Sequence, residues 1–344
     1  MGAIMDIINI PIGWLMRFLY QFVGNYGVAV ILLAVITKLL MVPLGIKQHK
    51  GQLSQMKFRK RIARIQKKYA NDQARMQQEM QKLQAEGYSP TAGCGTMLIQ
   101  FPILIGIYNV IRYPLQYVVG LNSDVINKLL ELYNNATGAA LANTAPEYQI
   151  TLIEHIGQNF DVYKTALADT NYFAINLDFL GMNLAAIPAK LEYFLQSIVP
   201  IPTFDASFLW LIPILSALTA AVSTILSQKM GPSKYMQDPN MQGKGTMAFM
   251  NVLGPYMSYA IAFSVPAGLG LYWVFSNILM TLQTIALNLI YNPAKYKEMY
   301  DKEEEERKLK KKKKRELAAK LAAEEAAKAN AAIEAASEHE KQDN

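Results

Sequence analysis

Residues 34–47 read AVITKLLMVPLGIK. This run is central to predicting the fold, because it is part of a long apolar stretch that contains a single charged residue, Lys38. The stretch extends back to residue 23 without another charge. A bilayer core about 30 Å thick needs roughly 20 mostly apolar helical residues. Backbone amides have no water partner in lipid, so such a span must be a helix. Residues 23–46 are therefore predicted to cross a membrane.

Four further stretches have a similar length and apolar composition. They lie at residues 96–119, 208–228, 247–265 and 268–291. Residues 1–22 mix Trp14 and Phe18 with Asp6 and Arg17, so they are too polar to span and are predicted to form an interfacial helix. We therefore predict an all-α polytopic membrane protein with five transmembrane helices.

The composition agrees with apolar spans separated by polar connections. Of 344 residues 52% are hydrophobic, yet the mean hydropathy is only +0.10. The formal net charge is +7, and the basic residues gather in two blocks, at 47–68 and 307–315. Such blocks at one membrane face indicate an anionic partner. The single cysteine, Cys94, excludes an internal disulfide framework, and we expect no cleavable signal because no basic leader is evident.

The distribution of lysine and arginine between the connections predicts the orientation. Residues 47–95 are dense in both, and the loop at 229–246 carries three lysines. The segment 120–207 holds three lysines against nine acidic residues. Since cytoplasmic connections carry the excess of basic residues, we expect the N-terminus outside and the C-terminus in the cytoplasm. Residues 120–207 then form an extracytoplasmic segment of short surface helices.

Residues 47–95 are predicted to form a cytoplasmic hairpin of two helices. Asp72 is a suitable N-cap for the second helix, and Gly87 with Pro90 ends it. The hairpin is either a solvated element with the usual positive charge, or a docking arm for anionic lipid headgroups or incoming chains. Flexible methionines suit the second role. The candidate docking residues are Arg59, Arg61, Arg64, Lys67, Lys68, Met76 and Met80.

Lys38 is the most informative residue in the chain. At 1.5 Å rise per residue, its backbone lies about 9–13 Å inside the inner membrane boundary. Burying an ammonium there costs about 2.5–3.5 kcal/mol on insertion scales. Either the side chain snorkels toward the interface, or it faces a water-filled pocket open to the cytoplasm. Polar stripes on the third and fifth spans favour the pocket, although such stripes also serve helix packing. The candidate groove residues are Lys38, Gln100, Ser223, Ser227, Trp273 and Asn277.

The chemistry of the predicted spans argues against catalysis. Histidine is present only at positions 49, 155 and 339, none of them in a span. An intramembrane serine protease would lack its base, and clustered histidine and cysteine ligands for a metal are missing. The spans contain no acidic residue, so a proton relay or a cation selectivity ring has no candidate. We expect no catalytic residue, no metal and no cofactor.

Three segments resemble the YidC/Oxa family of membrane protein insertases. They are VITKLLMVPLGIKQ at residues 35–48, KYANDQARMQQEMQKLQAEGYSPTAGCGTMLIQFPILIGIYNVI at 68–111 and PAGLGLYWVFSNILMTLQT at 266–284. They follow the family order and cover its core elements, whereas the outer segment and the end of the tail have no clear counterpart. Most bacterial members carry arginine where this chain has Lys38. The charge is kept, but the bidentate guanidinium is lost.

The resemblance implies a five-helix fold around a groove that opens to the cytoplasm and to lipid and is closed toward the outside. It also implies a bacterial plasma membrane, nascent membrane proteins as clients, and the Sec translocon and the ribosome as partners. Anionic lipids are a further expected partner because of the two basic blocks. The tail, residues 292–344, looks like the basic tails that bind ribosomes in some members. Lipid contact and a solubilising role are the alternatives. Its candidate contact residues are Lys310, Lys311, Lys312, Lys313, Lys314 and Arg315.

Two other functions stay open on the sequence. A small-solute transporter or an anion channel would be expected to show an inverted internal repeat, which we do not find. A scaffold that helps other membrane proteins to assemble, without moving polar segments across the bilayer, has no sequence feature that separates it from an insertase.

Overall fold

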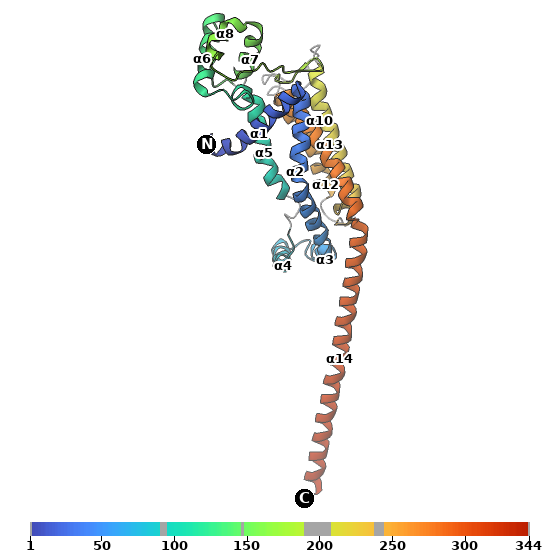
Figure 1. The fold of residues 1–344 in the computed structure, drawn as a ribbon. Coiled ribbons are helices and arrows are strands. Elements are labelled where there is room, and N and C mark those ends of the chain that lie inside the picture. Colours follow the sequence, from blue (N-terminus) through green and yellow to red (C-terminus); the bar gives the residue numbers. More distant parts are fainter. Residues whose placement is uncertain (1, 90–94, 146–147, 189–207, 237–243, 343–344) are drawn as a thin grey trace.

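The structure, a computed structural model, consists mainly of helices and loops (Figure 1). It describes residues 2–89, 95–145, 148–188, 208–236 and 244–342. Within these ranges only the backbone is described for residues 2–5, 95–100, 208, 236, 244–250, 325–327 and 329–342.

Four long helices form the bundle. They are α2 (Tyr26–Gln55), α10 (Leu211–Met230), α12 (Lys244–Ser264) and α13 (Ala267–Ile290). α13 contacts both α2 and α10, and α10 contacts α12. Within the part of the chain that the structure describes, α10, α13 and the helix that begins at Tyr26 are long and apolar enough to cross a membrane. This confirms an all-α membrane protein, whereas the number of five spans stays a prediction.

The predicted first span is part of a longer helix. α2 begins at Tyr26 because Asn25 is its N-cap: the Asn25 side chain accepts a hydrogen bond of 3.0 Å from the backbone N–H of Val28. The helix then runs unbroken to Gln55, nine residues beyond the predicted inner end at residue 46. The first span and the first part of the predicted hairpin are therefore one continuous helix.

The predicted second span, residues 96–119, is divided. α5 (Gly95–Arg112) ends just before Pro114, which has no backbone N–H to continue the helical ladder. One turn of π-helix, η2 (Leu115–Val119), follows. The apolar helix over the described side chains, Phe101–Arg112, is shorter than the three spans above.

The predicted hairpin begins after α2 with a short 3-10 turn. Its elements are η1 (Met56–Phe58), α3 (Arg59–Lys68) and α4 (Gln73–Ala85). α3 contacts α4. The predicted cap is confirmed, because the Asp72 carboxylate accepts a hydrogen bond of 3.0 Å from the backbone N–H of Arg75. α4 ends before Gly87, whose φ of +96° suits glycine.

The N-terminal helix α1 (Gly2–Val23) turns its polar side chains toward the protein. Arg17 donates hydrogen bonds to the carbonyl oxygens of Val118 and Val119, and Asn9 donates to the Tyr117 hydroxyl at 3.0 Å. The opposite face exposes an apolar stripe in which the aromatic rings stack in sequence. Its members are Ile7, Ile10, Trp14, Phe18 and Phe22. An outward apolar stripe is typical of a helix that lies in a membrane interface.

A small subdomain covers one end of the bundle, opposite to the hairpin (Figure 1). It consists of α6 (Ser123–Thr137), α7 (Tyr148–Gln158), α8 (Phe160–Leu167) and the antiparallel strands β1 (Asp178–Phe179) and β2 (Met182–Asn183). It caps α13 directly: the N–H groups of Ala267 and Gly268 donate to the carbonyl oxygens of Ala186 and Leu184 at 2.9 and 2.7 Å. The start of α13 is thereby fixed to the subdomain.

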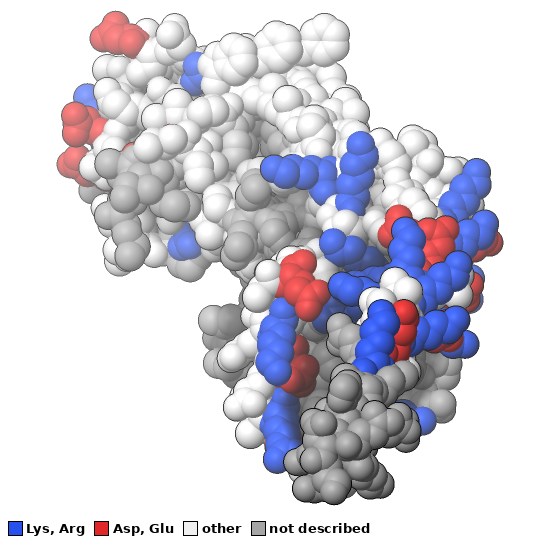
Figure 2. All heavy atoms as spheres, turned by 90° about the horizontal axis from the view of Figure 1, so that it is seen from below, with Lys and Arg blue, Asp and Glu red and all other residues white. Residues whose placement is uncertain are grey.

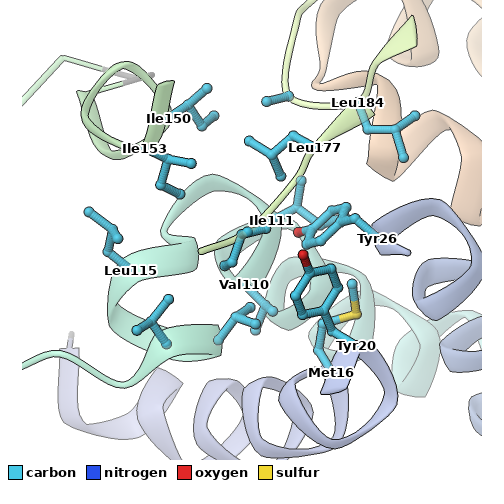
Figure 3. Close-up of a cluster of buried hydrophobic side chains, with 14 of the residues drawn as sticks. Met16, Tyr20, Tyr26, Val110, Ile111, Leu115, Ile150, Ile153, Leu177 and Leu184 are labelled. Atoms are coloured by element: carbon cyan, nitrogen blue, oxygen red, sulfur yellow. The ribbon is translucent and has the colours of Figure 1, made fainter. Parts of the chain in front are cut away.

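One continuous apolar core joins the subdomain to the bundle (Figure 3). Its side chains come from α1, α2, α5, α7 and the segment around the strands. Among them are Met16, Tyr20, Tyr26, Val110, Ile111, Leu115, Ile150, Ile153, Leu177 and Leu184, all less than 10% exposed. Apolar side chains buried to this extent are shielded from solvent. The end of the bundle beneath the subdomain is therefore dry.

The last helix, α14 (Pro293–Gln342), is 50 residues long and extends away from the bundle (Figure 1). It contacts η1 and the short helix α11 (Ser233–Met236) near its start. A short turn, η3 (Phe208–Trp210), precedes α10.

Candidate functional site

A cavity of about 450 Å³ lies between α2, α5, α10 and α13. Its volume is enough for on the order of fifteen water molecules. Along α2 its lining residues follow the helical repeat from Lys38 to Gln52, which corresponds to a length of about 21 Å. The cavity thus extends from the middle of the bundle toward the end at which the hairpin and the tail lie.

Lys38 marks the outer end of this cavity. It is half-buried and is the first residue of α2 in the lining, just as Trp273 is the first of α13. One residue earlier, the Thr37 hydroxyl donates to the Leu33 carbonyl oxygen at 2.8 Å and lies 3.4 Å from the Tyr272 hydroxyl. Tyr272 is 1% exposed. The dry core therefore begins directly above Lys38.

The predicted groove residues separate into two groups. Ser227 and Trp273 line the cavity together with Lys38. In contrast, Asn277 donates a hydrogen bond of 3.3 Å to the Thr219 hydroxyl and so links α13 to α10. Ser223 is buried outside the lining. The side chain of Gln100 lies outside the described residues.

Helix packing accounts for other members of the polar stripes as well. The Ser216 and Ser258 hydroxyls lie 2.9 Å apart and join α10 to α12. The alternative explanation for such stripes, close contact between helices, thus applies to much of the third span.

The sequence analysis missed the inner half of the lining, which is rich in amides. On α2 it omitted the lining residues on the cytoplasmic side of Gly45. Thr284 and Asn288, which also line the cavity, belong to the polar stripe of the fifth span that favoured the pocket. The cavity-lining polar residues that were not predicted are Gln48, His49, Gln52 and Gln283. The signal was present, because the stripe 38, 41, 45, 48, 52 keeps the helical repeat beyond residue 46. It was overlooked because the helix was expected to end there.

Two of these inner residues carry polar atoms without partners. His49 is 7% and Asn288 5% exposed. Within the described part of the chain, no hydrogen-bonding group reaches the Nε2 atom of His49 or the Oδ1 atom of Asn288. Gly45 lies close by, and a side chain in its place would collide with the amide of Gln283. The cavity is narrow at this level.

The predicted docking arginines form ion pairs within the protein. Arg59 donates two hydrogen bonds, of 2.5 and 2.7 Å, to the Asp301 carboxylate at the start of α14. Arg64 pairs with Glu304 in the same helix, and Arg61 pairs with Glu86 at the end of α4. The three guanidinium groups therefore hold the helices of the hairpin and the tail together.

These contacts lower the pKa values of two carboxylates on α14, Asp301 and Glu304. Burial raises the pKa of Asp301, but the hydrogen bonds and charges of Lys60 and Arg59 outweigh it and lower the pKa to about 2. For Glu304, burial also raises the pKa, and the hydrogen bonds from Arg64 and Lys308 lower it by more. Both carboxylates are consequently ionised at neutral pH.

The remaining predicted contact residues stand at the surface. Lys67 and Lys68 are exposed on α3, and Met76 and Met80 are half-buried on α4. All six basic residues from Lys310 to Arg315 are exposed on α14. Seen along the tail, basic side chains gather over the hairpin and α14, while acidic side chains lie among them and at the edge of the subdomain (Figure 2).

The amino-acid sequence is similar to those of known membrane proteins. The sequence pattern of the family described as 60Kd inner membrane protein matches residues 18–295. The membrane protein insertase YidC of Syntrophus aciditrophicus is 34% identical over 116 residues, which are 33% of this chain and 21% of the relative. The protein of that name from Nitratidesulfovibrio vulgaris is 37% identical over 99 residues, 28% of this chain and 18% of the relative. The protein of that name from Rickettsia prowazekii is 38% identical over 106 residues, which are 30% of this chain and 19% of the relative. The chain matches about a fifth of the length of these curated relatives.

Proposed function

We infer, because this chain belongs to the 60Kd inner membrane protein family, that it acts as a membrane protein insertase. The chain is a multi-pass protein of the bacterial inner membrane. The observation that carries the proposal is the position of Lys38, a cation at the outer end of a cavity that is lined by both polar and apolar side chains and lies beneath a dry core. Nascent membrane proteins are the proposed clients.

In this mechanism a short extracytoplasmic segment of the client enters the cavity from the cytoplasm. The ammonium group of Lys38 and the cavity water replace part of the hydration that polar and acidic groups of the segment lose. The adjoining apolar helix of the client enters the lipid, and its burial provides the driving force. The membrane potential adds about 2.3 kcal/mol per charge per 100 mV, which favours outward movement of acidic segments.

The dry outer core supports an insertase over an anion channel. A channel needs a continuous polar path, whereas Thr37 and Tyr272 meet above Lys38 and the apolar core follows. The cavity thus ends inside the bundle on the outer side. This one-sided shape suits a transient place for a client segment, with exit into lipid rather than through a pore.

The orientation with the N-terminus outside and the C-terminus in the cytoplasm is part of the proposal. The subdomain with excess acidic residues lies at one end of the bundle, and the basic hairpin and tail lie at the other (Figure 1). This separation of charge is the one that the positive-inside rule requires.

We assign the basic run of the tail to the ribosome rather than to lipid. Lys310 lies 20 residues beyond Ile290, the end of α13, and a helix of that length is about 30 Å long. The headgroup region extends only roughly 5–8 Å beyond the hydrocarbon core, and the Debye length is about 8 Å. A soluble polyanion such as ribosomal RNA is the partner within reach. The Sec translocon is a further proposed partner, through the family resemblance.

Docking of incoming chains is proposed for the part of the hairpin that ion pairs do not use. Met76 and Met80 provide adaptable apolar contacts on α4, and Lys67 and Lys68 provide exposed charge on α3. Arg59, Arg61 and Arg64 support this surface by holding its helices in place.

Purified protein in liposomes tests the function. A single-span client with an acidic translocated segment is offered, and protease protection measures insertion. Lys38→Ala should reduce insertion of this client strongly, Lys38→Arg should retain it, and Lys128→Ala, on the outer subdomain, should not change it. Normal insertion by Lys38→Ala would disprove the mechanism. Release of a trapped anion by the protein, without insertion, would favour the channel instead.

A further inference from the structure

The cavity differs in hydrogen-bonding character between its two ends. At the outer end, Lys38 offers an ammonium group, which only donates. At the inner end, His49 and Asn288 come from α2 and α13 and line the same cavity. Each is more than nine-tenths buried, and each has one polar atom without a partner among the described residues.

Both of these atoms are hydrogen-bond acceptors. The imidazole of His49 bonds to the backbone of Tyr291; since the Tyr291 N–H already donates to Leu287, its carbonyl oxygen accepts from the imidazole. In a neutral ring whose Nδ1 donates this hydrogen bond, Nε2 carries the lone pair. The Asn288 amide nitrogen donates to the Thr284 carbonyl oxygen at 2.9 Å, so its Oδ1 is available as an acceptor. Folded proteins rarely leave buried acceptors without donors.

The charges around His49 and Asn288 favour a neutral hydrogen-bond donor over a cationic one. The lining contains no aspartate or glutamate among its described residues. Lys38 lies in the same cavity, and the Lys50 ammonium lies 4.8 Å from the centre of the Tyr291 ring, which packs against His49. This positive field repels a cationic side chain. A neutral N–H group meets no such repulsion, and every client residue except proline supplies one.

We propose that His49 and Asn288 form an acceptor subsite for backbone N–H groups of an extended client segment. The proposal rests on the insertase function and specifies how the cavity holds clients of unrelated sequence. The nearby amides of Gln52 and Gln283 can donate to the carbonyl groups that alternate with these N–H groups along the segment. Lys38 then receives acidic side chains, and the inner subsite holds the backbone.

The spacing of the two ends gives the subsite a measurable signature. His49 follows Lys38 by 11 residues of helix, which corresponds to about 16 Å. An extended chain advances about 3.3 Å per residue. When an aspartate of the client pairs with Lys38, the backbone N–H groups at the subsite therefore belong to residues about five positions away.

The test uses the full chain in liposomes and a synthetic single-span client whose translocated segment contains glycine, serine and one aspartate. Single N-methyl groups are placed along the segment, because N-methylation removes one backbone donor without changing charge. Photocrosslinking measures client binding, and protease protection measures insertion. We expect binding to fall about three- to tenfold at one or two positions about five residues from the aspartate, and little elsewhere.

Variants connect this pattern to the two residues. His49→Leu with Asn288→Leu should weaken binding of the unmethylated client by a similar factor and abolish the position-dependent loss. Thr281→Val is the matched control on α13, because the Thr281 hydroxyl already donates to the Asn277 carbonyl oxygen at 2.8 Å and the residue is outside the lining. It should retain the pattern.

Equal binding of all N-methylated clients by the wild-type protein would overturn the proposal, since water would then satisfy both acceptors. So would a pattern that survives in the double variant, or one that Thr281→Val removes. The wild-type scan does not depend on how well a variant folds. If insertion still depends on Lys38 but binding does not depend on the position of the N-methyl group, only the subsite is refuted. If the wild-type protein inserts no client, the proposed function fails.

Discussion

Neutralising the ion pairs between the hairpin and the tail should release α14 from the bundle. The relevant carboxylates are Asp301 and Glu304, which pair with Arg59, Lys60 and Arg64 of α3. Further along the chain α14 extends away from the bundle (Figure 1). The double substitution Asp301→Asn with Glu304→Gln removes both charges while keeping the shape of the side chains.

The pKa of Asp301 sets the magnitude. It lies at about 2, against an ordinary value of 3.8, and a tenfold change in proton affinity corresponds to about 1.4 kcal/mol. The pairing is therefore worth at most about 2.5 kcal/mol. The Asp301 side chain is 25% exposed, so solvent screening reduces the contribution to about 1 kcal/mol. Glu304 adds a smaller amount of the same sign, and the two together change the docking equilibrium by roughly tenfold.

Spin labels on α4 and α14 measure the effect. With Cys94→Ser as background, labels at Gln84→Cys and Lys320→Cys should give a narrow distance distribution at pH 7 and a broad one after the double substitution. Because the pKa of Asp301 is lowered in the folded protein, its contribution is complete above the ordinary value of 3.8 and is lost as the pH falls toward 2. The wild-type distribution should broaden over that interval.

A matched control lies further along the tail. Lys312 and Glu316 pair at 3.8 Å within α14. Glu316→Gln should leave the distances unchanged. A narrow distribution in the Asp301 and Glu304 variant at pH 7, or in the wild-type protein at pH 2, would refute the reasoning.

Three further predictions concern the interfacial helix, the outer strands and the tail. Gly13→Ala should lower stability by about 1–3 kcal/mol in thermal denaturation, because its Cβ would lie 2.5 Å from the Tyr117 carbonyl oxygen. Gly157→Ala in helix α7, where the Cβ would have no atom within 4 Å, should not lower stability. Leu180→Gly should stabilise the turn between β1 and β2 by about 1 kcal/mol, visible as slower hydrogen exchange there, because Leu180 has a φ of 52° and is 78% exposed. Substitution of all six residues 310–315 by glutamine should weaken cosedimentation of the protein with ribosomes and reduce the salt dependence of that binding. Binding to anionic vesicles should stay unchanged. Loss of vesicle binding instead would assign the basic run to lipid.

The sequence was sufficient for features that depend on local pattern. Apolar length identified three helices that can cross a membrane, the one that begins at Tyr26, α10 and α13. Asp72 was recognised as a cap because N-capping needs only the next three residues. Lys38 was placed beside a cavity because a buried ammonium needs water or an anion. Each of these inferences follows from chemistry within one or two turns of helix.

Features that depend on distant partners could not be predicted. The partners of Arg59 and Arg64 follow more than 200 residues later in the chain, and helical periodicity gives no information about them. Ser227 and Asn277 belong to similar polar stripes, yet one lines the cavity and the other joins two helices. The same spacing serves both purposes, so only the packing of the bundle distinguishes them.

The position of the dry core also decides how a client would leave the cavity. Outward passage between α2 and α13 would separate Val30, Leu33 and Tyr272, each at most 1% exposed. Exposing three such side chains costs on the order of 5–9 kcal/mol. The membrane potential supplies only about 2.3 kcal/mol per charge per 100 mV, so one or two client charges do not open this path. Movement sideways into lipid leaves the core closed and buries the client's own apolar helix. A thiol-reactive crosslinker that joins cysteines at Thr37 of α2 and Tyr272 of α13, whose hydroxyls lie 3.4 Å apart, should therefore leave insertion intact. Loss of insertion upon crosslinking would show that clients pass through the core.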